Sequence, residues 1–138
     1  MDQEKLLAEM HMKHLEMLQA VISRMASNSS SAKTYCMSIS SALIALSAAI
    51  KDANVLYFSI PMIMIFSLLD GYYLRLERAF RDQYNSARRR KKNEEPDFEI
   101  SPSWTAGSGR LSGVLSWSVW IFYLPVILTF LAVARILG

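Results

Sequence analysis

The sequence predicts an all-α integral membrane protein with three transmembrane helices. Residues 34–50, 55–69 and 111–134 contain no charged side chain, so the 15 Lys and Arg and the 12 Asp and Glu residues all lie outside these windows. A soluble helical domain interleaves charged and apolar residues at helical spacing, whereas a membrane protein separates them into blocks. The polar residues 51–54 and the loop-like residues 93–110, which contain Pro and Gly, separate the three windows.

Residues 1–32 are predicted to form an amphipathic helix before the first span. Over residues 1–27, apolar side chains and one histidine recur every three or four positions, at Leu7, Met10, His14, Met17, Val21 and Met25. Acidic and basic residues nearly balance here, whereas a helix on a lipid surface is usually cationic. We therefore expect this helix to pack against a second copy or another protein helix. The polar residues 28–31 either end it and cap the next helix, or lie within one continuous, slightly bent helix.

The first predicted span, at about 33–50, is rich in small residues. Small side chains let helix backbones approach closely in lipid, and serine hydroxyls can hydrogen-bond across such a contact. The composition therefore predicts that this helix lies inside a bundle or an oligomer, either as a packing seam or as a water-lined face of a pore. The residues assigned to this seam are Ser38, Ser40, Ser41, Ala45, Ser47 and Ala49.

The second predicted span, at about 55–70, follows a tight turn and completes a helical hairpin over residues 33–71. Pro61 lies inside this span and is expected to kink it. Asp70 is either an interfacial carboxylate or a buried acid that pairs with an arginine of a neighbouring subunit. An apolar stripe continues past the membrane, so the span is expected to extend into a cytoplasmic helix. The residues predicted to form inter-subunit ion pairs are Asp70, Arg75, Glu77, Arg78 and Arg81.

The distribution of basic residues predicts the topology. Thirteen of the 15 Lys and Arg residues precede the first span or lie between the second and third spans, and only Lys51 and Arg135 lie on the other side. The positive-inside rule then places the amino terminus and the basic segment 72–110 in the cytoplasm. The third span, within 111–138, leads the carboxyl terminus outside. The residues expected to contact anionic lipid headgroups are Arg88, Arg89, Arg90, Lys91 and Lys92.

The sequence offers no set of side chains for catalysis, and neither a metal nor another cofactor is expected. His11 and His14 lie near one helix face, but no third ligand is evident beside them. No phosphate-binding loop and no nucleophile motif is present, and the single cysteine, Cys36, is interpreted as a packed thiol. One short basic run beside a membrane is not the shaped surface that recognises nucleic acid. We therefore expect a protein that is not an enzyme and that does not bind nucleic acid.

Two segments resemble a known group of proteins. Residues 70–81, DGYYLRLERAFR, and residues 24–29, RMASNS, leading through Lys33 into the first span, resemble small bacterial membrane proteins of the RipA-like, oligomeric type. The layout is also similar to that of the two-helix SLATT effectors of bacterial anti-phage systems, which disrupt membranes after a cytoplasmic sensor fires. The likeness covers about residues 20–90, and the third span departs from the two-helix pattern. The resemblance implies a multi-pass protein of the bacterial inner membrane, a homo-oligomer and no enzymatic activity.

These features lead to two functional hypotheses. In the first, the chain forms a homo-oligomer that acts as a pore or perturbs the membrane, for example as an effector in anti-phage defence. In the second, it is a non-conducting scaffold or regulatory subunit that recruits a cytoplasmic protein partner through residues 1–27 and 72–104. Membrane lipids are partners in both hypotheses.

Overall fold

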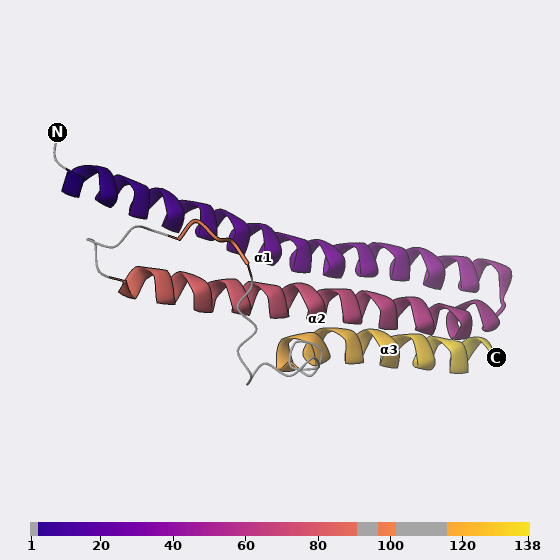
Figure 1. Ribbon diagram of the computed structural model, residues 1–138. Coiled ribbons are helices and arrows are strands. Elements are labelled where there is room, and N and C mark those ends of the chain that lie inside the picture. Colours follow the sequence, from indigo (N-terminus) through magenta and orange to yellow (C-terminus); the bar gives the residue numbers. More distant parts are fainter. Residues whose placement is uncertain (1–2, 91–96, 102–115) are drawn as a thin grey trace.

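The computed structural model describes residues 3–90, 97–101 and 116–138, and these residues form an all-α fold with three helices. Helix α1 spans Gln3–Ile50, α2 spans Asn54–Arg89 and α3 spans Trp117–Leu137. The helices lie side by side with α2 in the middle, so that α2 packs against both neighbours (Figure 1). Each helix is long and apolar enough to cross a membrane. The all-α prediction and the three apolar helices are therefore confirmed.

Helix α1 is continuous through the polar residues 28–31, which was one of the two alternatives that the sequence left open. The predicted amphipathic helix and the first span are therefore parts of one helix of 48 residues. Ser29 does not cap a helix end, because it is buried against α2. Thr34 instead donates a side-chain hydrogen bond to the Ser30 carbonyl one turn earlier, at 3.1 Å. Such bonds satisfy hydroxyl groups within a helix, so this polar stretch does not interrupt it.

The turn between α1 and α2 is held by local hydrogen bonds. Lys51 ends α1 in the left-handed region, with φ of 55°, a conformation that often follows the last residue of a helix. The Ser47 hydroxyl donates to the Asp52 carbonyl at 2.7 Å, and the Asp52 carboxylate accepts from the Asn54 backbone N–H at 2.9 Å. These bonds reverse the chain within three residues, as the tight-turn prediction requires.

The face of α2 that packs inside the bundle follows a seven-residue repeat. Leu56, Ile63 and Asp70 are buried and lie seven positions apart, and the buried residues Phe80 and Ala87 continue a second such series. A repeat of seven keeps one stripe of a helix against its partner over many turns. Pro61 is exposed on the outer side, and the helix continues through it.

Helix α3 packs on the half of α2 that follows the α1–α2 turn. The carboxyl terminus of α3 lies beside that turn (Figure 1). A Cβ atom placed on Gly138 would lie 3.7 Å from the Ala53 Cβ. At its other end, the Ser116 hydroxyl accepts a hydrogen bond from Arg78 at 2.8 Å, and Tyr123 donates to the Phe66 carbonyl at 3.3 Å. The predicted third span began at residue 111, but residues 111–115 lie outside the described part.

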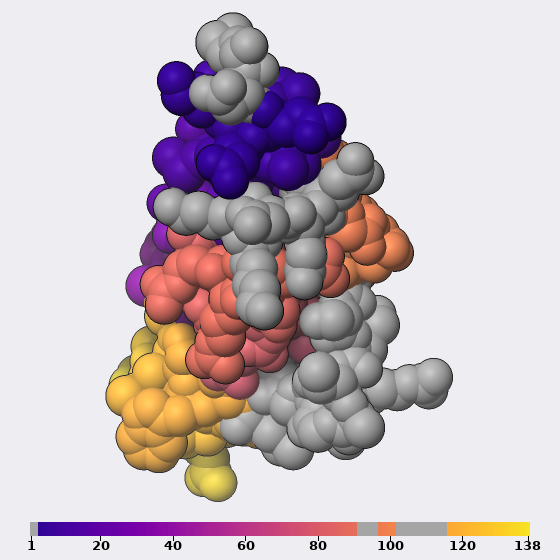
Figure 2. Space-filling model, turned by 60° about the vertical axis from the view of Figure 1, so that its left-hand side comes forward, coloured from indigo at the N-terminus to yellow at the C-terminus, as the bar shows by residue number. Residues whose placement is uncertain are grey.

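Two separate apolar clusters form the interior. The first cluster, in the half of the bundle beside the α1–α2 turn, joins all three helices around Cys36, Ile63 and Tyr123. The second cluster joins the amino-terminal half of α1 to the carboxyl-terminal half of α2 around Leu18 and Phe80. Figure 2 views the molecule toward the end where this second cluster lies and shows α1, α2 and α3 stacked in that order, with residues 97–101 on one side.

Candidate functional site

A polar layer of three residues, Ser29, Lys33 and Asp70, separates the two apolar clusters. The Lys33 ammonium lies 2.7 Å from Asp70 Oδ2 and donates a hydrogen bond to Ser29 Oγ at 3.3 Å. Ser29 Oγ in turn donates to Asp70 Oδ1. The contact between Lys33 and Oδ2 is close but lacks the alignment of a hydrogen bond, so it is an ion pair. The layer thus joins α1 to α2 through one ion pair and through the Ser29 hydroxyl, which accepts from Lys33 and donates to Asp70.

The two charged members of the polar layer differ in their access to solvent. The Asp70 side chain is fully buried, whereas the Lys33 side chain is 24% exposed. A buried carboxylate needs a counter-charge and hydrogen-bond donors, because an uncompensated charge inside a protein carries a desolvation penalty of several kcal/mol. Asp70 therefore depends on Lys33 and Ser29 more strongly than Lys33 depends on Asp70.

Several residues that were predicted to form ion pairs between subunits have partners within the chain. Asp70 contacts Lys33, and Glu77 accepts from Arg81 one turn later at 2.8 Å. Arg78 donates to the Ser116 hydroxyl, as described above, and Arg75 is also engaged. Asp70 is not an exposed interfacial carboxylate, since it is fully buried. Pairing between subunits stays a prediction, and for Asp70 it would require the polar layer to open.

The predicted seam of small residues divides between two faces of α1. Ser40 and Ser47 are buried and face the other helices. Four residues of the predicted seam lie on the opposite, exposed face: Ser38, Ser41, Ala45 and Ala49. Ala42 and Ala48 share this exposure, and the name outer small-residue face is used below for these six residues. The Ser38 and Ser41 hydroxyls bond to the Thr34 and Met37 carbonyls of their own helix.

The basic run lies at the end of the α1–α2 hairpin that is distant from the turn. Arg88, Arg89 and Arg90 are exposed there, while Lys91 and Lys92 lie outside the described residues. Arg88 lies five helical turns beyond Asp70 on a continuous helix, or roughly 27 Å along its axis. Contact of these arginines with lipid headgroups stays a prediction, and it requires the hairpin end to approach the membrane surface.

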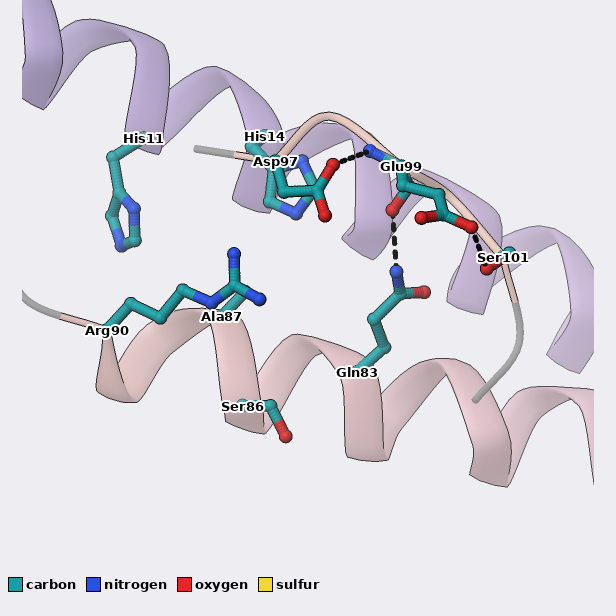
Figure 3. Close-up of a pocket in the computed structure, with 9 residues that line it drawn as sticks. All are labelled: His11, His14, Gln83, Ser86, Ala87, Arg90, Asp97, Glu99 and Ser101. Carbon is teal, nitrogen blue, oxygen red and sulfur yellow. Dashed lines mark hydrogen bonds between the residues drawn. The ribbon is translucent and has the colours of Figure 1, made fainter. Parts of the chain in front are cut away.

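His11 and His14 line a cavity between α1, α2 and residues 97–101 (Figure 3). Burial lowers the pKa of His14, and the nearby His11 and Arg90 lower it further, against an opposing effect of Asp97. Within the described residues, no group of three or more His, Cys, Asp or Glu side chains is placed to hold a metal ion. The two histidines instead share this cavity with Arg90 and Asp97.

Comparisons with protein-family models, curated proteins and solved structures found no match to the chain. The resemblance to RipA-like proteins and to SLATT effectors therefore rests on the sequence segments alone.

Sequence reasoning named Asp70 but did not bring it together with Ser29 and Lys33. A signal for the pair is present, because Lys33 and Asp70 each border a charge-free window on the same side of the hairpin. The seven-residue repeat of α2 also places Asp70 in register with the buried Leu56 and Ile63. A carboxylate at such a position needs a cation from the facing helix, and Lys33 is the basic residue at that level of α1.

Proposed function

We propose that the chain is a homo-oligomeric protein of a bacterial cytoplasmic membrane that acts on the membrane itself, as a pore or by perturbing the bilayer. The observation that carries this proposal is the outer small-residue face of α1, which neither α2 nor α3 covers. A role as an effector in anti-phage defence is the biological setting that the SLATT-like layout implies.

The outer small-residue face suits another protein helix better than lipid. Close packing of helix backbones, rather than a hydrophobic driving force, holds helices together inside a bilayer, and small residues permit that approach. Elsewhere on the membrane-spanning parts, large apolar side chains are exposed, such as Phe58, Ile65 and Trp117. A second copy of the chain is the occupant that the RipA-like resemblance implies. The α1 helices would then pack together at the centre of the oligomer.

The serines on the outer small-residue face are compatible with both a dry seam and a water-lined path. Ser38 and Ser41 satisfy their hydroxyl donors within α1, so neither needs water. Each oxygen keeps acceptor capacity that water or a neighbouring helix can use. The proposal of a pore therefore depends on how the copies are arranged around α1, and conductance must be measured directly.

The orientation follows from charge. The α1–α2 turn, with Lys51, and the carboxyl terminus, with Arg135 nearby, lie at one end of the bundle (Figure 1). Placing that end outside leaves the richly basic end in the cytoplasm, as the positive-inside rule favours. The hairpin of residues 3–32 and 71–90 would then project into the cytoplasm.

Subunit stoichiometry in nanodiscs, measured by native mass spectrometry, tests the oligomer. Ala45→Leu adds a large side chain to the outer small-residue face and should reduce the number of subunits or abolish assembly. Ala132→Leu is the matched control, because Ala132 is an equally small, exposed residue on α3. A monomeric wild-type chain, or equal stoichiometry in both variants, would refute assembly through this face.

A membrane-potential dye in cells with induced expression tests action on the membrane. Wild-type protein should depolarise the membrane, and Ala45→Leu should not, at equal amounts of protein in the membrane. Ser40→Leu and Ser47→Leu are unsuitable as pore variants, because both residues are buried within the chain and the larger side chain would disturb folding. Full polarisation with the wild-type chain, also in the presence of a triggering infection, would exclude the pore.

The second candidate function is a non-conducting scaffold. It is favoured by large apolar side chains that are exposed on the part of α1 before the membrane, at Leu6, Met12 and Met17. A cytoplasmic protein helix could cover them. The dye experiment discriminates, because a scaffold leaves the membrane polarised, and Leu6→Ser with Met17→Ser should then release a co-purifying partner.

A further inference from the structure

The cavity at the far end of the hairpin has walls from three segments. Residues 97–101 are held between α1 and α2 by three contacts (Figure 3). Gln83 donates to the Glu99 carbonyl at 2.6 Å, the Phe98 ring meets His14 edge-on at 5.7 Å, and Ile100 packs on the second apolar cluster. The cavity is partly open to solvent and measures about 230 Å³. One water needs roughly 10–15 Å³ of such volume, so there is room for a small organic molecule.

Two opposite charges face this cavity without meeting. Arg90 at the end of α2 and Asp97 on the neighbouring segment both line it, and neither has an ion-pair partner within the described part of the chain. The second acid, Glu99, is partly engaged, because its carboxylate accepts a hydrogen bond from Ser101 at 2.7 Å. One Asp97 oxygen accepts the Glu99 backbone N–H at 3.3 Å, which leaves the other available.

Two buried polar atoms at the cavity also lack partners. His14 is only 4% exposed, and its Nδ1 atom has no hydrogen-bond partner in the described residues. The same holds for Oε1 of Gln83. Buried polar atoms in folded proteins are almost always paired. Gln83 Oε1 is always a hydrogen-bond acceptor. His14 Nδ1 is also an acceptor when the proton of the neutral ring is on Nε2.

We propose that this cavity binds a small zwitterion of the α-amino acid type, with its carboxylate on Arg90 and its ammonium group on Asp97. A guanidinium pairs with a carboxylate through two parallel hydrogen bonds, and His11 lies close enough to line the same end. The ammonium group has three N–H donors, and the free oxygen of the Asp97 carboxylate can accept one of them. Ser86 and Ser101 complete a polar lining.

Ligands with a single charge fit less well. An isolated anion would satisfy Arg90 but would also face Asp97 and Glu99, while an isolated cation would face Arg90. A lipid headgroup would reach the cavity only if the hairpin end approached the membrane surface, because His14 precedes Lys33 by about five turns of continuous helix, or roughly 28 Å. We therefore assign the ligand to the soluble pool. This inference does not depend on the proposed oligomer or pore.

Isothermal titration of the full-length chain in nanodiscs with individual α-amino acids tests the proposal. At least one should bind saturably with a dissociation constant below about 10 mM. Removing one charge from that ligand, as propionate and ethylamine do for alanine, should weaken binding at least about tenfold, because a charge-assisted hydrogen bond is lost. Equal binding of a single-charge analogue would overturn the proposal, and so would the absence of binding by every amino acid.

Matched variants locate the site. Arg90→Gln and Asp97→Asn should each weaken binding at least about tenfold. The controls Arg89→Gln and Asp82→Asn remove the same charges from exposed residues that do not line the cavity, and they should bind like the wild type. All four changes are at exposed positions, and circular dichroism verifies that each variant folds. Unchanged binding in both cavity variants would place the ligand elsewhere and refute the assignment.

Discussion

Replacing Lys33 by Met should destabilise the fold far more than removing any surface charge. The change takes away the only cation beside the fully buried Asp70 carboxylate in the described structure, and leaves Ser29 as its remaining partner. Breaking a buried ion pair in this way costs about 3–5 kcal/mol. Because Lys33 is 24% exposed, water can reach part of the site, so we expect the lower end, about 3 kcal/mol.

The loss of stability should depend on which member of the Lys33–Asp70 pair is changed. Asp70→Asn keeps an acceptor for Ser29 and leaves Lys33, which can turn its ammonium group toward solvent. Its cost should therefore be only about 1–2 kcal/mol, the scale of a lost hydrogen bond to a charged group. The double variant Lys33→Met with Asp70→Leu replaces the whole pair by apolar groups. It should recover most of the lost stability and can exceed the wild type by about 1–4 kcal/mol.

Equilibrium unfolding in mixed micelles, followed by tryptophan fluorescence, measures these differences. Lys13→Met is the control, since the Lys13–Glu16 pair is exposed at both ends, with side chains 76% and 64% accessible. An exposed pair of this kind contributes about 0–1 kcal/mol. The reasoning fails if Lys33→Met loses no more stability than Lys13→Met, or if Asp70→Asn is the more damaging change.

Three further outcomes follow from single contacts. His14 has a pKa below its ordinary value of 6.5 in the folded protein, so below pH 6.5 the unfolded chain binds a proton that the folded chain does not. Stability should be full above pH 6.5 and fall below it, by up to about 1.4 kcal/mol per pH unit, and His14→Gln should flatten this profile in unfolding titrations. Tyr123→Phe loses the hydrogen bond to the Phe66 carbonyl and should cost about 1 kcal/mol in the same assay. Ser47→Ala removes the bond to the Asp52 carbonyl and should cost a similar amount, whereas Ser41→Ala, at an exposed serine, should be neutral.

The long apolar helices could be predicted because a bilayer demands long blocks without charge. Residues 34–50 and 55–69 therefore locate the apolar parts of α1 and α2, and the four residues between them leave room only for a tight turn. The continuity of α1 through residues 28–31 was harder to decide. Serine and asparagine suit a helix cap and a buried polar position equally well. Ser29 occupies a buried polar position, because Asp70 faces it.

The cavity at the hairpin end could not be predicted from sequence. The spacing of His11 and His14 places both near one helix face, but Arg90 and Asp97 reach them only through tertiary contacts. In particular, residues 97–101 have no regular secondary structure, and their path depends on where Phe98 and Ile100 pack. Hydrophobic periodicity carries no information about such a path.

The polar layer also explains why the hairpin has a single register. A seven-residue repeat alone permits α1 and α2 to slide past each other by one repeat while apolar residues still meet apolar residues. In this antiparallel pair, such a slip would place Asp70 opposite Ala26 or Ser40, neither of which is a cation. A buried carboxylate without a counter-charge would then disfavour the slipped state by several kcal/mol.

The same register places the cavity at the end of the hairpin. His14 lies opposite Arg90 in the alignment that pairs Lys33 with Asp70, so the ion pair near the middle of the hairpin sets which residues meet at its end. It does not decide which face of α1 is exposed, because a slip by one seven-residue repeat keeps the same face of α1 against α2. A change at the polar layer should therefore affect the cavity, although the cavity is not in contact with Asp70. This dependence distinguishes a register-setting pair from one that contributes only to stability.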